Sequence, residues 1–211
     1  MLPALLAAVT FICFFGQDSR VLTNDEKYDA VFAAYKEACT MGVQPYRQWA
    51  SEQRGQKSFY PNCIDAIGYG YYTDGLPLYY AYYDINGDGT DELFIAQDGN
   101  QSLTLLDAYT YHNDEVIKLF PDISLGDRAN LYIKADGELL INGSSGADYP
   151  LAEYYVLPKD TCQPAFSHGY CPYEYVRKYP GYTPIYTTFW YTYVDTSGIQ
   201  SEFPWNVLSM E

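Results

Sequence analysis

The stretch that decides the fold runs from Tyr82 to Ile95 and reads YYDINGDGTDELFI. Asp84, Asn86 and Asp88 supply side-chain oxygens at alternate positions, and Gly89 follows the third of them. Hard cations such as Ca²⁺ take about six to eight oxygen ligands, and a tight curl of the chain brings such oxygens together. Glycine permits the positive φ that the curl needs. The pattern predicts a Ca²⁺ site made by Asp84, Asn86, Asp88, the carbonyl oxygen of Thr90, and Glu92.

The segments on either side of this loop read as strands. An EF-hand joins two helices and places a bidentate Glu at its twelfth position, where this chain has Ile95. The loop instead resembles the calcium loops of FG-GAP and integrin propeller repeats and of dockerins. In those loops a carboxylate near the ninth position closes the metal shell, and Glu92 stands there. The alternative is a turn rich in Asp, Asn and Gly that binds no metal.

The composition limits the class of protein. The chain has 211 residues, which predicts one domain. Its net charge of −15 argues against nucleic acid as a partner, because neutralising phosphates requires clustered Lys and Arg. An acidic surface fits a secreted protein in a calcium-rich medium. The 25 tyrosines favour a β-rich fold with Tyr on the sheet faces, although Tyr also offers flat contact area for sugars or proteins.

An uncharged apolar run occupies residues 2–15. Its length suits the core of a signal peptide better than a membrane span. We therefore expect a signal peptide or an N-terminal anchor over residues 1–18 and a secreted or cell-surface protein, with membrane contact only through that anchor. Lipid attachment at Cys13 and an N-terminal helix packed on the core are the alternatives.

The rest of the chain, 19–211, predicts a single α+β domain. Its helical part covers about residues 23–67: a helix with a capping box from Thr23 to Glu26, a second near 45–53 and a third near 61–67. The β part covers about 76–195. The expected fold is an N-terminal helix, or two to three helices, packed on a mainly antiparallel β meander. The apolar stripe expected on the first helix consists of Tyr28, Val31, Phe32, Tyr35 and Cys39. The strands expected after the metal loop cover residues 103–111, 116–120, 131–134, 138–141 and 152–157.

A wider resemblance covers about residues 76–157. Exported proteins of Gram-positive gut bacteria look similar, with an N-terminal helix, a loop of the type Asp-Ile-Asn-Gly-Asp-Gly-x-x-Glu-Leu and a tyrosine-rich strand. That strand is followed by a turn and Val-x-Lys-Leu, which here ends at Leu119. This resemblance implies export and carries no activity with it.

Four cysteines follow the apolar run. An even number in an exported chain suggests two disulfides, and proximity in sequence favours Cys39 with Cys63 and Cys162 with Cys171. A zinc site that includes His168 is the alternative, although the chain has no Cys-x-x-Cys.

No motif of the sequence indicates catalysis, and no catalytic residue is proposed. Nucleophilic catalysis needs a Ser or Cys beside a base, and the only histidines are His112 and His168. We therefore expect a calcium-binding, non-catalytic binding or scaffold module whose partner is an extracellular protein or glycan. The alternative is a carbohydrate-binding or glycan-active protein that uses exposed aromatics, with Trp49, Trp190 and Trp205 as candidates.

Overall fold

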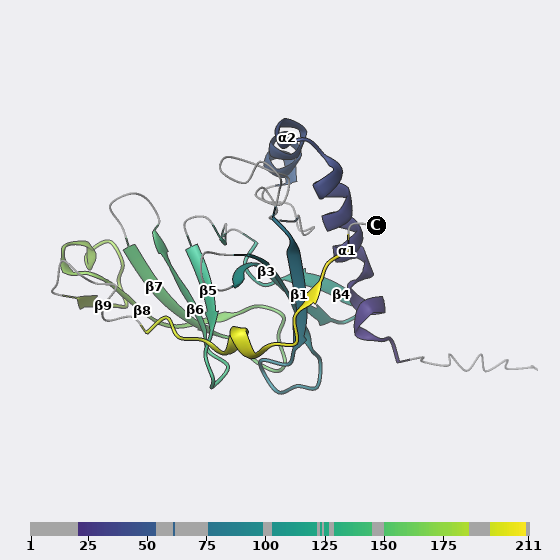
Figure 1. The fold of residues 1–211 in the computed structure, drawn as a ribbon. Coiled ribbons are helices and arrows are strands. Elements are labelled where there is room, and N and C mark those ends of the chain that lie inside the picture. The colour runs from purple at the N-terminus through teal and green to yellow at the C-terminus, as the bar shows by residue number, and fades with distance from the viewer. Residues whose placement is uncertain are drawn as a thin grey trace, which may run out of the picture.

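The computed structural model describes residues 21–53, 61, 76–98, 103–121, 123, 125–126, 129–144, 150–185 and 195–209. The expected signal peptide, most of the expected third helix, Cys13, Cys63 and Trp190 lie outside these residues. Within them the chain forms two α-helices and ten strands, so the expected α+β class is confirmed (Figure 1).

The helical part begins with α1 (Asn24–Thr40), which is followed by α2 (Val43–Gln53). The expected capping box is present: the Glu26 amide donates to Thr23 Oγ1 at 3.3 Å, and the Thr23 amide donates to Glu26 Oε2 at 2.9 Å. These two bonds satisfy amides that the helix itself leaves without acceptors. The fully buried side chains of α1 follow helical spacing, and they are Tyr28, Val31, Tyr35 and Ala38.

The first sheet has the strand order β10-β1-β2-β3-β4, and every pairing in it is antiparallel. Its members are β1 (Leu78–Tyr83), β2 (Glu92–Asp98), β3 (Leu103–His112), β4 (Glu115–Lys118) and β10 (Asn206–Val207). The expected hairpin between β3 and β4 is present. Asn113 and Asp114 form its turn with φ of 51° and 62°, the left-handed conformation that such two-residue turns need.

The second sheet has the order β5-β6-β7-β8-β9. Four strands are antiparallel neighbours, and β9 lies parallel to β8. The strands are β5 (Ala129–Ile133), β6 (Leu139–Ser144), β7 (Pro150–Val156), β8 (Ala165–Pro172) and β9 (Tyr182–Ile185). Two 3₁₀ turns, η1 (Tyr173–Tyr175) and η3 (Ile199–Glu202), complete the described elements.

The elements stack in three layers, with the first sheet in the middle (Figure 1). One face of this sheet packs against α1, and the other packs against the second sheet. The central strand β2 is therefore buried on both faces, and only its last residue, Asp98, is exposed. The buried members of the core between the two sheets include Phe94, Leu105, Leu131, Leu139 and Phe203.

The C-terminal segment closes the structure. In Figure 1 it runs in yellow from the second sheet to the edge of the first, where β10 pairs with β1. On this path Phe203 stacks on Tyr83 with ring centroids 4.4 Å apart and packs against Phe94. The sequence pattern does not predict this return, because a two-residue strand carries no periodicity.

One expected disulfide is wrong: Cys162 is a free thiol. The expected disulfide would close residues 162–171 into a loop, whereas most of that segment is the extended strand β8. A strand rises about 3.3 Å per residue, so Cys171 lies about 20 Å along β8 from Ala165. A disulfide needs Cα atoms within about 7 Å. The Cys39–Cys63 bond stays a prediction.

No described helix combines the length and the apolar character required to span a membrane.

The contribution of the C-terminal segment can be measured with Phe203→Ala. Because the side chain is only 6 % exposed and fills the core between the sheets, we expect a loss of about 3–5 kcal/mol in the free energy of unfolding in urea. Val207→Ala, at an exposed position of the same segment, is the control and should change stability far less. Equal effects of the two changes would contradict the packing.

Candidate metal centre

The loop between β1 and β2 curls around the carboxylate of Asp84. The amides of Gly87 and Asp88 donate to its Oδ1 at 2.7 and 3.2 Å, and the Gly89 amide donates to its Oδ2 at 2.9 Å. Gly87 and Gly89, with φ of 69° and 89°, make this curl possible, because residues that carry a side chain rarely adopt such φ values. The first expected ligand therefore lies at the centre of the loop.

The next two expected ligands face the same turn of chain. The Asp88 amide donates to Asn86 Oδ1 at 3.0 Å, and the Thr90 amide donates to Asp88 Oδ1 at 2.7 Å. The Asn86 side-chain amide also donates to Asp88 Oδ2 at 3.1 Å. The side-chain oxygens of alternate residues thus turn inward and accept hydrogen bonds from the loop itself.

Glu92 is the first residue of β2 and is completely buried. Its Oε2 accepts the Ile85 amide at 3.0 Å, and its Oε1 accepts the Thr110 hydroxyl at 3.0 Å. The pKa of the Glu92 carboxyl is raised to about 7: burial is the largest cause, the negative charges of Asp88 and Asp84 add to it, and the two hydrogen bonds act in the opposite direction. The loop thus contains a buried acid that lacks a positive partner among the groups bonded to it.

Asp91, the remaining acid of the stretch, turns away from the loop. Its Oδ2 accepts the Asn24 side-chain amide at 2.7 Å, and its carbonyl oxygen accepts the Tyr28 hydroxyl at 2.7 Å. Both partners belong to α1. Asp91 therefore ties the loop to the helix, which agrees with its omission from the expected ligands.

The second sheet contacts the loop from the other side. Lys159, after β7, donates from Nζ to the carbonyl oxygen of Gly87 at 2.7 Å. Gly137, in the turn between β5 and β6, lies so close that an added Cβ would sit 2.5 Å from the Ile85 oxygen. Only glycine fits there, and its φ of 86° also favours glycine. The loop therefore lies at the junction of both sheets and α1.

In the described part of the chain, no three side chains of His, Cys, Asp or Glu are grouped closely enough to hold a metal ion together. The donor set of the loop is nevertheless the one that Ca²⁺ prefers: two aspartates, an asparagine, a backbone carbonyl and a glutamate. Asp84 Oδ1 accepts two amides, whereas Asp84 Oδ2 and both carboxylate oxygens of Asp88 accept one hydrogen bond each and keep a lone pair for a cation. The residues therefore fit calcium by chemistry.

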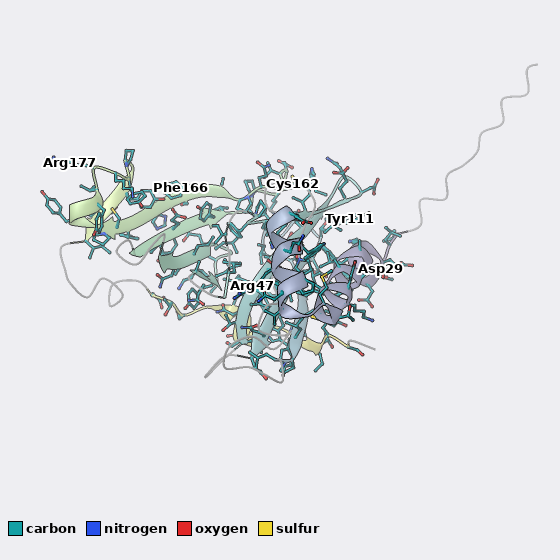
Figure 2. The ribbon with its side chains drawn as sticks, turned by 90° about the horizontal axis from the view of Figure 1, so that it is seen from above. Asp29, Arg47, Tyr111, Cys162, Phe166 and Arg177 are labelled. Atoms are coloured by element: carbon teal, nitrogen blue, oxygen red, sulfur yellow. The ribbon has the colours of Figure 1, made fainter. Side chains whose placement is uncertain are left out.

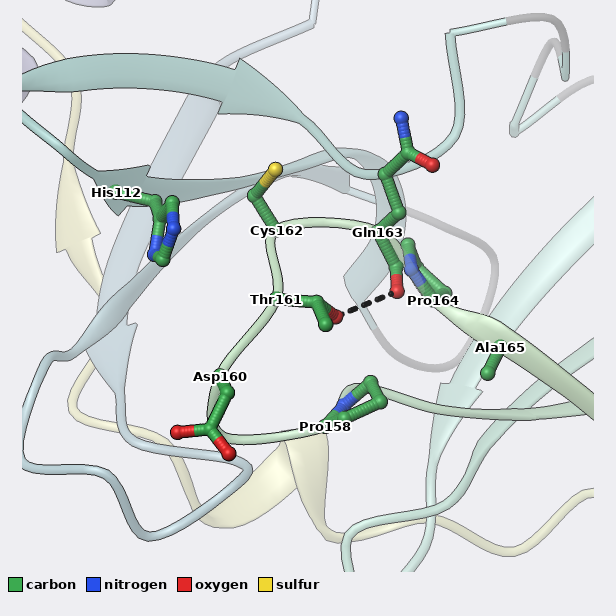
Figure 3. A pocket seen from close by; sticks show the side chains of 8 residues that line it. All are labelled: His112, Pro158, Asp160, Thr161, Cys162, Gln163, Pro164 and Ala165. Atoms are coloured by element: carbon green, nitrogen blue, oxygen red, sulfur yellow. Dashed lines mark hydrogen bonds between the residues drawn. The ribbon is translucent and has the colours of Figure 1, made fainter.

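A hollow of about 540 Å³ lies between the end of β3 and the loop after β7 (Figure 3). Its lining includes His112, Asp160 and Cys162, and Thr161 donates to the Gln163 carbonyl at 3.2 Å. His112 and Cys162 both line this hollow, and no hydrogen bond joins their described side chains. His168 lies in β8 rather than in a closed loop, and it stacks on Tyr154 with ring centroids 4.2 Å apart.

Two groups of polar residues were not singled out in the sequence. Glu153, on β7, accepts the hydroxyls of Tyr155, at 2.8 Å, and of Tyr182. Asp107 and Lys118 form a buried ion pair beneath α1. The sequence carries two signals of this ion pair: Asp107 is an acid inside the apolar run LTLLDAY, and Lys118 is a lysine at the end of a short strand.

No protein-family model, no curated protein and no solved structure matches this chain.

The buried glutamate gives a prediction on pH. Its folded-state pKa, about 7, exceeds its ordinary value of 4.5, so its contribution to stability is complete below pH 4.5 and is lost as the pH rises through 7. In EDTA, Glu92→Gln should therefore show a smaller fall in melting temperature between pH 5 and pH 8 than the unchanged protein.

Glu115→Gln is the matched control, because Glu115 is exposed at the start of β4. It should follow the unchanged protein. An identical pH profile for Glu92→Gln would show that Glu92 does not carry this charge penalty.

Proposed function

We propose that the loop from Asp84 to Glu92 binds Ca²⁺ and that the protein is an extracellular, calcium-stabilised, non-catalytic binding or scaffold module. The observation that carries the proposal is Glu92: a completely buried carboxylate that faces the loop and whose pKa is raised by burial and by two aspartates of the same loop. A divalent cation offsets such repulsion, and it does so best where water is excluded.

The roles of the residues follow from their positions. Asp84, Asn86, Asp88, the Thr90 carbonyl and Glu92 would hold the ion, which supplies positive charge and fixes the oxygens around one point. The Asn86 amide group donates to Asp88 Oδ2, and this bond has to open so that both oxygens can face the cation. Lys159 places its ammonium on the neighbouring Gly87 carbonyl and so supplies some positive charge to the acidic loop.

Calcium at this point would stabilise more than the loop. Asp91 connects the loop to α1, Thr110 connects Glu92 to β3, and Lys159 and Gly137 connect the loop to the second sheet. A ligand that binds only the folded junction shifts the folding equilibrium toward the native state. Metal binding is therefore coupled to the docking of all three layers.

The proposal includes a place and a partner. Extracellular calcium modules bind the ion with dissociation constants of about 10⁻⁴–10⁻³ M, which suits exposed loops with few charged ligands. The net charge of −15 favours a secreted protein that remains soluble, and an extracellular protein or glycan is the proposed partner. Attachment to a membrane would occur only through the N-terminal apolar run.

Chelation gives the direct test. A ligand at 100 times its dissociation constant stabilises a protein by about 2.7 kcal/mol, which corresponds to about 5–10 °C for a chain of this size. We expect EDTA to lower the melting temperature by this amount relative to saturating Ca²⁺. Calorimetric titration should show one calcium site that Asp84→Ala and Asp88→Ala weaken at least tenfold.

Asp91→Ala is the matched control, since this carboxylate bonds to Asn24 of α1 instead of facing the loop. It should leave the calcium affinity within about threefold of the unchanged protein. Equal losses in all three variants would show that the ligands are assigned wrongly. An unchanged melting curve with EDTA would count against the metal site as a whole.

Glycan binding is kept as the alternative because of one surface. Phe166 is 45 % exposed and packs on Tyr182 with centroids 5.4 Å apart, on the part of the molecule away from α1 (Figure 2), and the Tyr182 hydroxyl donates to Glu153. Aromatic faces beside a carboxylate suit sugars. The rings are tilted by 32°, however, and Trp49 and Trp205 pack against the cores, which favours the non-sugar reading.

A glycan array can separate the two proposals. If the Phe166 surface binds sugar, the protein should bind to specific oligosaccharides on the array, and Phe166→Ala should abolish that binding. Tyr173→Ala, at another exposed aromatic residue, is the control and should retain them. A protein that binds calcium but retains no glycan supports the first proposal alone.

A further inference from the structure

Asp107 and Lys118 lie side by side on neighbouring strands, facing α1. Lys118 stands opposite Tyr109 in the β3–β4 pairing, and Asp107 is two residues before Tyr109, so the three side chains share one face of the sheet. Regular alternation along β3 therefore turns Asp107 toward α1, where it meets Lys118 and the helix. A β-bulge comes directly before it: Asp107 pairs with Ile95 and Leu105 with Ala96, which leaves Leu106 as one extra residue between them.

The pair is excluded from water. The side chains of Lys118 and Asp107 are 5 % and 0 % exposed, and Lys118 Nζ forms an ion pair with Asp107 Oδ1. The cover comes from α1 and from the apolar side chains packed on this face, including Leu106 and Tyr109. Two full charges here carry a large desolvation cost. Transfer of one proton from Nζ to the carboxylate removes both charges and leaves a neutral amine beside a neutral carboxylic acid.

The other oxygen of the carboxyl group is held by phenols. The Tyr35 hydroxyl, from α1, and the Tyr109 hydroxyl, at 3.1 Å, both donate to Asp107 Oδ2. The two oxygens are therefore distinct: Oδ1 faces the amine, and Oδ2 faces two donors. Donors fixed on one oxygen of a carboxyl group stabilise the negative charge that develops there when a nucleophile adds to the carbon.

We propose that Lys118 and Asp107 condense to an isopeptide bond between Nζ and Cγ, which joins β4 to β3 covalently. The neutral amine adds its lone pair to Cγ, and the negative charge develops on Oδ2 between the hydroxyls of Tyr35 and Tyr109. A proton from Nζ passes to Oδ1, the Cγ–Oδ1 bond breaks, and Oδ1 leaves as water. The acid and the amine thus give one amide and one water molecule, and no oxidant or cofactor is consumed.

Proximity supplies the driving force for the condensation. Groups held in a fixed, productive geometry react with effective molarities of about 10⁵–10⁸ M, whereas free acids and amines in water remain apart. The dry site also disfavours hydrolysis, because the released water leaves to solvent. The consequence for the fold is that β4, a four-residue edge strand, is locked in place.

A second lysine–aspartate pair shows what the site adds. Lys134 and Asp195 also form an ion pair, with Nζ and Oδ2 2.9 Å apart, but the aspartate side chain is 71 % exposed. Lys134 Nζ further donates to the carbonyl oxygens of Asp195 and Ser197. The aspartate of this pair is open to water and no phenol of the described residues is bonded to it, so the pair serves as an internal control.

Mass spectrometry of the purified full chain tests the proposal. Trypsin cuts after Lys118 in an unmodified chain and releases a peptide of residues 58–118. A lysine bound as an amide is not cut, so we expect one peptide of residues 58–128, about 18 Da lighter than its sequence, which corresponds to one water. Cleavage after Lys134 should be normal. Recovery of the peptide 58–118 at full mass would show an ordinary buried ion pair and overturn the proposal.

Two variants check the chemistry in the same protein. Lys118→Arg keeps the charge but cannot form this amide, so its mass should equal the sequence mass, whereas Lys134→Arg should keep the loss of water. Tyr35→Phe removes one donor to Oδ2 and should slow the mass change after synthesis by about 100-fold. A loss of water that persists in Lys118→Arg would place the modification elsewhere, and an unchanged rate in Tyr35→Phe would remove Tyr35 from the reaction.

Discussion

The central strand β2 lies between α1 on one side and the second sheet on the other, and this burial on both faces constrains the rest of the structure. Six of its seven residues are buried, including the carboxylate of Glu92. A polar group at such a place requires partners, because water cannot reach it. Glu92 receives the Ile85 amide and the Thr110 hydroxyl, and both hold the loop before β2 against β3. The proposed calcium ion would therefore compensate the negative charge of the buried Glu92 carboxylate.

The same constraint operates on the face of the first sheet that packs against α1. Asp107 lies on this face two residues before Tyr109 in β3 and is surrounded there by Lys118, Tyr35 and Tyr109. In both places a carboxylate is taken out of water and its chemistry changes: Glu92 becomes a weaker acid, and Asp107 meets an amine at close range. The two sites differ in their neighbours, because aspartates surround the first and a lysine faces the second.

Local patterns predicted most elements correctly where neighbouring residues decide the structure. The capping box at Thr23, the β3–β4 turn at Asn113 and Asp114, and the curl around Asp84 are all settled by side chains within about five residues. The same locality separated Asp91 from the expected ligands. Local patterns do not predict the elements that depend on distant partners. The segment of β8 was expected to be a disulfide-closed loop, and no strand was predicted at β9 or β10.

By itself, therefore, the sequence determined the class of the fold, the oxygen-rich loop with its two glycines, and an acidic, tyrosine-rich composition. Only the tertiary structure decided that the loop meets Lys159 and Gly137 of the second sheet and that Cys162 stays a free thiol. Only the tertiary structure also paired Asp107 with Lys118. The physical reason is that hydrogen-bonded turns form between near neighbours, whereas burial and the contacts between layers depend on how whole strands and helices pack; the Tyr35 hydroxyl that reaches Asp107 comes from a residue 72 positions away in the chain.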